Sequence, residues 1–279
     1  MTALQRPPAT PSVAARWTVT ILPACLAVLL LGSHHAHSAT VVANWKNANT
    51  TGAVLTNANT NSPTFGDGSA SNAQSAFAVS LLGTSTSPFS YTLNQVGDQI
   101  TVWGSINLTG GAGPDSDYRF GLFNDNGGFD ANNNSGWNGY LLQGNTIFRG
   151  RTDGVFLSTL SNAVNLNATA LTNTGSFNKN SAADFDYAMT ITRTGANAVE
   201  ISASLIGGDG NLVRQLVATD TGVTNFTYTA HGWLFGGGSQ LNQAQFSNVM
   251  VSPEPAAPLL SLLGAVALLA VRRRPGSRR

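Results

Sequence analysis

Charged residues are scarce in this chain. Lysine and arginine contribute 14 of its 279 residues and aspartate and glutamate contribute 13, so charged side chains make up 10% of the sequence. An ordinary soluble domain has roughly 25%. The shortage disfavours a helical bundle, which needs alanine, glutamate, lysine and leucine in bulk, and a disordered chain, which is usually highly charged and poor in aromatic residues. The sequence therefore predicts an all-β domain with many turns.

A cluster of basic residues is also missing from the body of the chain. Residues 40–253 hold seven basic and twelve acidic residues, and the overall charge of +1 arises because both ends are rich in arginine. A protein that binds nucleic acid needs a concentrated positive surface. We therefore expect no nucleic-acid partner.

Cysteine and histidine are almost absent. The single cysteine, Cys25, lies in an apolar segment near the N-terminus, so the body of the chain has none for a disulfide. A domain of about 210 residues does not need one, since it can bury most of its surface in one core. His231 is the only histidine of the body, and we interpret it as a turn residue in Ala-His-Gly. Catalytic zinc, which takes several histidine or cysteine ligands, is excluded by this count.

The N-terminal segment has the pattern of a secretory signal peptide. Two arginines precede the apolar run TVTILPACLAVLLLG at 18–32, and small residues follow it. This order predicts a signal peptide at 1–39, exported by the Sec machinery and cleaved after Ser38 or Ala39. Leu-Pro-Ala-Cys25 approximates a lipoprotein box, but the apolar run continues past the cysteine, which argues against lipidation.

The C-terminal segment has three parts in order. Pro253, Glu254 and Pro255 precede sixteen uncharged residues at 256–271, and an arginine-rich end follows, with Arg272, Arg273, Arg274, Arg278 and Arg279. Sixteen helical residues reach roughly 24 Å, a little short of a 30 Å hydrocarbon core, and long arginine side chains can make up the difference. The arginines act as stop-transfer charges that stay cytoplasmic, which places residues 40–253 outside the inner membrane.

This arrangement resembles the PEP-CTERM sorting signal of Gram-negative envelope proteins. The resemblance covers about 27 residues, with Pro253-Glu254-Pro255 as the sorting motif. It implies an exosortase-type membrane protease as partner, transient anchoring in the inner membrane, removal of the helix and arginine tail, and delivery to the cell envelope or extracellular matrix. The alternative is a permanent single-span anchor. We thus divide the chain into a signal peptide at 1–39, a β-sandwich domain at 40–252 and a sorting signal at 253–279.

The body alternates between apolar and polar residues in short runs. Between Asp98 and Leu108 one face carries Ile100, Val102, Ile106 and Leu108, and the other face is polar apart from Trp103. Similar runs are expected as strands at 76–82, 89–93, 118–123, 139–143, 154–159, 185–194, 198–206, 212–218, 225–230, 232–235 and 244–251.

The expected strands define a fold class. A dozen short strands predict a two-sheet antiparallel sandwich or jelly roll, with a hairpin at 207–210, an edge strand plus loop in 40–75 and room for a short helix at 163–171. The strand carrying Phe246-Ser-Asn248-Val249 resembles the closing strand of concanavalin-A-like sandwiches of the LamG or jelly-roll type. That resemblance implies no catalytic residues.

The body of the chain has few residues that could be catalytic. Glu200 is the only glutamate of the body, and the Glu-x-Asp-x-x-Glu pattern that a glycosidase of this fold would carry is absent. No Gly-x-Ser-x-Gly nucleophile elbow exists. We therefore predict a protein that is not an enzyme, and a polysaccharide-degrading enzyme is the interpretation favoured least.

The segment 124–140 is rich in oxygen ligands. Asp130, Asn132 and Asn134 have the alternate spacing of a calcium loop, but Ser135 and Leu141 stand where an EF-hand needs glycine and glutamate. A looser calcium site that also uses Asp125 remains as a hypothesis, and no other cofactor is expected. The alternative is a long loop of Asx turns.

Aromatic residues suggest a carbohydrate ligand. Trp137 and Tyr140 flank the same segment, and Trp103 projects from the polar face of its strand, where rings could stack on sugars. Arg119, Arg149 and Arg151 could donate hydrogen bonds to the sugar hydroxyls. The alternative places these tryptophans in the core. We therefore expect an exported, non-catalytic surface or matrix protein, with a carbohydrate-binding module that contacts exopolysaccharide as the alternative.

Overall fold

The computed structural model describes nine stretches of the body: 38–47, 54–66, 77–110, 118–127, 137–150, 163–175, 184–207, 212–235 and 241–254. They belong to a compact unit that spans Ala36–Ala257. The predicted signal peptide and C-terminal helix lie outside the described residues. Within those residues, the structure has no helix long and apolar enough to cross a membrane.

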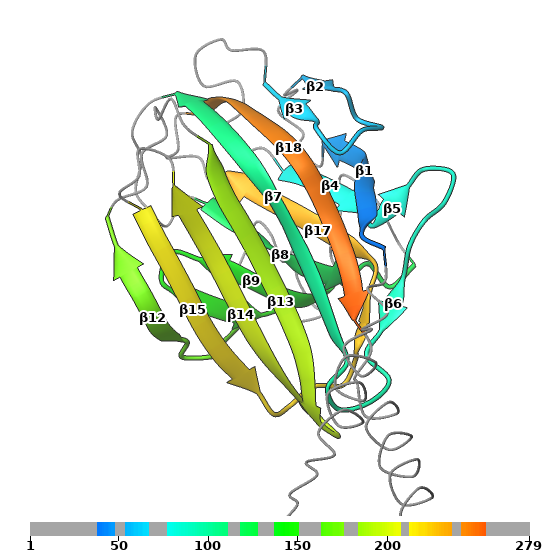
Figure 1. The fold of residues 1–279 in the computed structure, drawn as a ribbon, viewed down its shortest axis with the longest axis vertical. Helices are drawn as coiled ribbons and strands as arrows, with labels where there is room; N and C mark the ends of the chain where they lie inside the picture. Colours follow the sequence, from blue (N-terminus) through cyan, green and yellow to red (C-terminus); the bar gives the residue numbers. More distant parts are fainter. Residues whose placement is uncertain are drawn as a thin grey trace, which may run out of the picture. The chain divides into compact units, whose positions relative to one another are not determined.

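Every regular element of the described residues is a β-strand, as the sequence predicted (Figure 1). The strands are β1 (Thr40–Asn47), β2 (Leu55–Thr56), β3 (Thr64–Phe65), β4 (Phe77–Leu81), β5 (Gly83–Thr84), β6 (Tyr91–Thr92), β7 (Gln99–Gly110), β8 (Tyr118–Asn124), β9 (Asn138–Gln143), β10 (Thr146–Arg149), β11 (Val164–Asn165), β12 (Thr169–Thr174), β13 (Phe185–Gly195), β14 (Ala198–Gly207), β15 (Leu212–Asp220), β16 (Thr227–Tyr228), β17 (Ala230–Phe235) and β18 (Leu241–Glu254).

The strands form two layers. The first sheet has the order β12-β15-β14-β13-β7-β18, and the second has the order β11-β10-β9-β8-β17-β4. Strand β1 joins them, because its first residues pair with β18 (Thr40 with Val251) and its last residues pair with β4 (Asn44 with Leu81). The paired strands thus make one antiparallel sheet that curls at β1 into the two layers of a sandwich, and β6 and β16 form a small separate sheet. The prediction of an edge strand within 40–75 is wrong for β1, which is paired on both sides.

Alternating residues build the core between the layers. In β7 the predicted apolar face, Ile100, Val102, Ile106 and Leu108, is fully buried, while Trp103 on the other face is half-buried. Burial of such a face is the main favourable term in folding and scales with the apolar area removed from water.

Aromatic rings fill the space where the layers meet. The ring of Phe120 in β8 lies 5.3 Å from that of Tyr187 in β13, and Trp233 in β17 lies 6.0 Å from Phe246 in β18. Edge and tilted arrangements of this kind are favourable for aromatic pairs. These contacts fasten the second sheet to the first without a disulfide.

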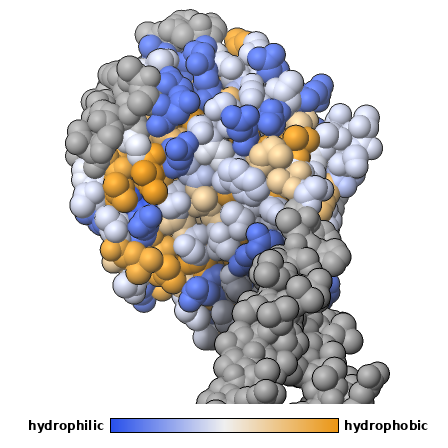
Figure 2. Space-filling model, in the orientation of Figure 1, coloured by the Kyte–Doolittle hydropathy of each residue, from blue (hydrophilic) through white to orange (hydrophobic). Residues whose placement is uncertain are grey.

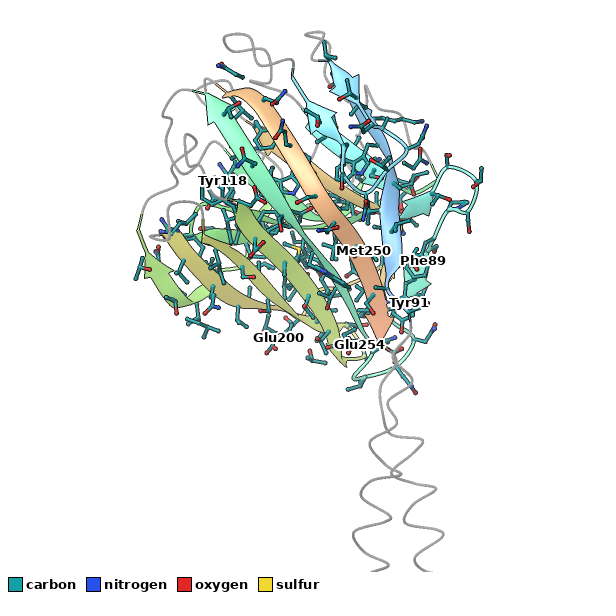
Figure 3. All side chains as sticks on the ribbon, turned by 45° about the horizontal axis from the view of Figure 1, so that its top comes forward. Phe89, Tyr91, Tyr118, Glu200, Met250 and Glu254 are labelled. Carbon is teal, nitrogen blue, oxygen red and sulfur yellow. The ribbon has the colours of Figure 1, made fainter. Side chains whose placement is uncertain are left out.

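The outer face of the first sheet is polar for the most part. Figure 2 shows blue and pale residues over most of it, with apolar patches near β12 and β15. The exposed large apolar side chains of this sheet are Leu171 and Ile206. Glu200 projects from the outer face of β14, away from the core (Figure 3).

Two local expectations meet different outcomes. The hairpin is confirmed, because β14 and β15 are antiparallel neighbours that begin pairing at Gly207 and Leu212. The short helix at 163–171 is wrong, since β11 and the edge strand β12 occupy this segment. The strand expected at 154–159 lies outside the described residues.

The last strand runs into the triplet Pro253-Glu254-Pro255. Pro253 pairs with Ile100 and Glu254 with Gln99, whose amide donates a hydrogen bond to the Glu254 carboxylate. Glu254 lies at the same end of the sandwich as Tyr91 (Figure 3). Burial and the charges of Asp98 and Glu254 raise the pKa of Tyr91 to about 12.

Candidate functional site

A groove opens at one end of the two layers. Its volume is about 420 Å³, within the 300–1,000 Å³ that is common for ligand sites. The start of β9, the end of β10 and the segment that follows β15 form its walls. The lining residues are Asn138, Gly139, Tyr140, Arg149, Gly150, Gly222, Val223, Thr224, Asn225, Thr227 and Tyr228.

The carboxylate of Asp220 organises one wall of this groove. Its Oδ1 accepts from Arg149 Nη1 at 2.6 Å and from the Gly222 amide at 2.9 Å, and its Oδ2 accepts from the Tyr140 hydroxyl at 2.8 Å. The carboxylate is almost fully buried, whereas the Arg149 side chain keeps 28% of its exposure. Because β15 belongs to the first sheet and β9 and β10 to the second, this cluster ties the layers together.

Glycine at position 222 leaves room for the Arg149 side chain. A Cβ at Gly222 would lie 2.6 Å from Arg149 Nη1, so a larger residue would displace the guanidinium. Nη1 also donates to the Gly222 carbonyl at 3.0 Å. The turn after Asp220 can therefore close tightly over the end of β10.

Two buried phenols stay neutral in the groove. Burial, followed by the neighbouring Tyr228 and the charge of Asp220, raises the pKa of Tyr140 far above its ordinary value. Burial and the charge of Asp220 likewise raise the pKa of Tyr228. The buried Tyr228 hydroxyl has no hydrogen-bond partner among the described residues. Both phenols thus keep their protons, and one hydroxyl has unused hydrogen-bonding capacity.

The predicted sugar-stacking residues lie in three different places. Trp137 is 0% exposed and packs 5.8 Å from Phe123 in a smaller apolar cluster. A buried ring has no face for a sugar, so the interpretation of Trp137 as a stacking platform is wrong. Tyr140 is 3% exposed and reaches the groove wall, where its hydroxyl is committed to Asp220.

Trp103 lies apart from the groove. It lines a hollow of about 280 Å³ on the outer face of the first sheet, beside Asp186, Ile206 and Asn248. Trp103, Trp137 and Tyr140 therefore do not form one site.

Of the residues proposed to bind calcium, Asp125 is the one that lies within the described residues. Its Oδ1 accepts from the Thr229 hydroxyl at 2.7 Å and from the Gly127 amide at 3.3 Å. Asp130, Asn132 and Asn134 lie outside the described residues. Among the described stretches, no group of three His, Cys, Asp or Glu side chains comes together. The calcium loop stays a prediction.

His231 is a core residue, and its assignment to a turn is wrong. It belongs to β17 and is fully buried, with Nδ1 2.9 Å from the Gly121 carbonyl oxygen and Nε2 3.2 Å from the Tyr187 hydroxyl. Burial lowers its pKa to about 4. The ring is neutral and closed off from substrate, so it is unsuited to a catalytic relay.

Of the residues that line the groove, Tyr140 and Arg149 were named in the sugar-binding hypothesis, and the others were not predicted. Asp220 and Arg149 are 71 positions apart and come from different sheets. The only local signal was Asp220-Thr-Gly222 at the end of an alternating run, which indicates a turn. Nothing in the sequence pairs that turn with Arg149.

Comparison with known proteins gives similarity to solved structures alone. No family model and no curated protein matches the chain. Lectin II from Ulex europaeus is 10% identical over 77% of this chain and 96% of its own, with a TM-score of 0.42. The carbohydrate recognition domain of Emp46p is 14% identical over 76% of this chain and 88% of its own, with a TM-score of 0.42. An endo-1,3-beta-glucanase from Streptomyces sioyaensis is 9% identical over 77% of this chain and 92% of its own, with a TM-score of 0.39. At these scores the likeness carries no argument, and the fold rests on the strand pairing described above.

Proposed function

We propose that this chain is an exported, non-catalytic protein of the cell surface or extracellular matrix. The observation that carries the proposal is the extent of the folded part. The compact unit spans Ala36–Ala257, and its strands run from Thr40 to Glu254. These limits fall beside both predicted processing points, so removal of the two targeting segments leaves every strand in place.

The two chain ends support the same proposal. Thr40, the first residue of β1, pairs directly with Val251 of β18, three residues before the end of that strand. The signal peptide and the sorting signal would therefore leave the sandwich from neighbouring strands. Two cuts there release the domain without breaking its core, which contains no cysteine.

Mass spectrometry of protein released from the cell surface tests the processing. We expect an N-terminus at Ala39 or Thr40 and a C-terminus near Pro255. An intact Arg279 end would contradict the proposal. Replacing Arg272, Arg273 and Arg274 by glutamine should weaken orientation and retention in the membrane, because the positive charges that stop transfer are lost. The matched replacement by lysine keeps the charge and should behave as the natural protein does.

The triplet can be tested apart from the fold. Glu254→Gln keeps an amide oxygen that can accept from Gln99, so the end of β18 should stay paired. If the protease reads the carboxylate, this variant should accumulate unprocessed while its melting temperature stays unchanged. Normal processing of Glu254→Gln would show that the charge of the triplet is not read.

A carbohydrate-binding module is the alternative. One solved structure with a similar fold is a lectin complexed with galactose, but its TM-score of 0.43 gives no support here. The observation in favour of this alternative is the polar groove beside Asp220. A polysaccharide-degrading enzyme is favoured least, since the one glutamate of the body, Glu200, projects from the outer face of β14.

A further inference from the structure

We propose that the fold regulates its own sorting: pairing with β7 shields the end of β18, and the membrane protease can cut beside it only while these residues are detached from β7. This inference rests on the proposed function, since it takes a cut near Pro255 as given. Release of the mature domain then depends on local opening of the sandwich.

The first two residues of the sorting triplet belong to a strand. Pro253 and Glu254 pair with Ile100 and Gln99, and the end of β18 lies along β7 (Figure 1). Pro253 is buried, while Glu254 is exposed. A peptide that binds in extended form is recognised through its backbone groups and its alternate side chains. As long as β18 stays paired, Pro253 remains inside the sandwich and a protease cannot surround it.

The Glu254 carboxylate is held by hydrogen bonds that cross three strands. The Thr192 hydroxyl of β13 donates to Gln99 Oε1 at 3.4 Å, and Gln99 Nε2 donates to Glu254 Oε2. Gln99 lies between the two because β7 pairs with β13 on one side and with β18 on the other. The charged side chain of the triplet is therefore engaged by the sheet while β18 is closed.

The chain has no free linker between the strand and the apolar segment. β18 ends at Glu254, and Pro255 alone precedes the uncharged run at 256–271. One residue spans at most about 3.3–3.6 Å. A protease contacts residues on both sides of the bond that it cuts, so a cut beside Pro255 must engage residues of β18.

The end of β18 can open without unfolding the domain. The pairing of β1 with β18 reaches Val251, and β7 is the one strand that pairs with Pro253 and Glu254 among the described residues. Pro253 also has no backbone N–H to donate to β7. Strand ends of this kind open locally at a lower free energy than the whole domain. When opening is fast relative to cleavage, the rate of cleavage follows the population of the open form.

The test locks the end of β18 with a disulfide. Thr101→Cys combined with Ser252→Cys joins directly opposed residues of β7 and β18 and leaves the triplet unchanged. Opposed residues of antiparallel strands have Cα atoms about 4.5–5.5 Å apart, which suits a disulfide. The matched control is Asn107→Cys combined with Gln245→Cys, which joins the same two strands nearer the start of β18.

The full-length variants are expressed in cells that contain the sorting protease, with the disulfides confirmed by thiol labelling and the products measured by mass spectrometry. We expect the natural protein and the control to be released with a C-terminus near Pro255. The oxidised Thr101→Cys/Ser252→Cys variant should stay in the membrane with Arg279 intact, and a reductant should restore its release.

Three results would overturn the proposal. If the locked variant is released as fast as the natural protein, shielding by β7 is wrong and the proposed function stands. If the control is blocked as well, the end of β18 has no special role. If the natural protein itself keeps Arg279, the shielding and the proposed function fail together.

A second variant loosens the same end. Gln99→Leu removes the hydrogen bond to Glu254 and should make processing about two- to fivefold faster, the change that loss of one exposed hydrogen bond makes in the opening equilibrium. The control is Gln245→Leu, which removes a side-chain bond to Gln243 within β18 and should leave the rate unchanged. A rate that is unchanged or slower in Gln99→Leu would overturn the role given to Gln99.

Discussion

Two polar clusters in this weakly charged protein are buried in contrasting ways. In the core, His231 has one ring nitrogen beside the Gly121 carbonyl and the other beside the Tyr187 hydroxyl. At the groove, Asp220 takes three donors, but the nearby Tyr228 hydroxyl takes none among the described residues. The core cluster is complete within the protein, and the groove cluster is one partner short.

The two clusters differ in what their buried polar groups contribute to the protein. A buried polar group whose partners all belong to the fold specifies how the layers pack and leaves nothing for a ligand. A buried group without a partner costs stability and specifies no packing. Loss of a hydroxyl from the core cluster should therefore cost more stability than loss of the Tyr228 hydroxyl.

The largest expected effect is the acid sensitivity of the core cluster. The pKa of His231 is lowered to about 4 in the folded protein, whereas an unfolded histidine titrates near 6.5. Between these values the unfolded chain binds more protons, so stability falls as the pH is lowered. We expect His231 to cost about 3 kcal/mol at pH 4 relative to pH 7, measured by chemical denaturation. His231→Gln should remove this part of the dependence of stability on pH. An unchanged pH dependence would contradict a buried, neutral His231.

Removal of the groove carboxylate should come next. Asp220→Ala leaves Arg149, the Tyr140 hydroxyl and the Gly222 amide without their acceptor. Breaking a buried pair costs 3–5 kcal/mol, but Arg149 is partly solvated, so we expect a loss of about 2–3 kcal/mol. The control is Asp186→Ala on the outer face, where the exposed carboxylate accepts from the Ser105 hydroxyl, and about 0.5 kcal/mol is expected. Equal losses would show that the Asp220 cluster does not join the layers.

A direct comparison of the clusters comes from removing one hydroxyl from each. Tyr187→Phe takes a hydrogen bond from His231 and should cost about 1 kcal/mol. Tyr228→Phe removes a buried hydroxyl that has no partner among the described residues, and it should leave the free energy of unfolding unchanged or raise it slightly. Thermal melts of both variants in the absence of sugar measure this. A destabilised Tyr228→Phe protein would mean that its hydroxyl already has a structural role.

The sequence predicted the layers better than the groove. Alternation from Ile100 to Leu108 marks a strand with one buried face, because side chains of a strand point to opposite sides in turn. That rule is local and needs no knowledge of the partner strand. The pairing of Asp220 with Arg149 depends on which strands of the two sheets end at the same place, and no local rule gives this.

Two further residues show where local reasoning failed. Trp137 is flanked by glycine and asparagine, which favour an exposed loop, yet it packs with Phe123, Leu141 and Leu234 in a second apolar cluster. His231 lies in Ala-His-Gly, a turn-like sequence, but pairing of β17 with both β4 and β8 makes it part of a central strand. In both cases tertiary burial outweighed the preference of the neighbouring residues.

The last expected effect concerns Asp125, which sharpens the comparison by asking to which kind of cluster another buried acid belongs. Its Oδ1 accepts from Thr229 and Gly127, and an asparagine oxygen could accept from both. Asp125→Asn should therefore cost about 0.5 kcal/mol or less, and Asp125→Ala, which loses both bonds, about 1–2 kcal/mol.

Calcium decides whether Asp125 also serves a ligand. Since this carboxylate is already engaged by protein donors, we expect the melting temperature to be the same with millimolar calcium as with EDTA. A calcium-dependent rise would follow from mass action if the loop binds the ion. If that rise were lost in both Asp125→Asn and Asp130→Ala, the carboxylate of Asp125 would be a ligand of the calcium ion. If Asp125→Asn kept the rise, the ion would be held by the loop without this carboxylate, and Asp125 would belong with His231 as part of the architecture.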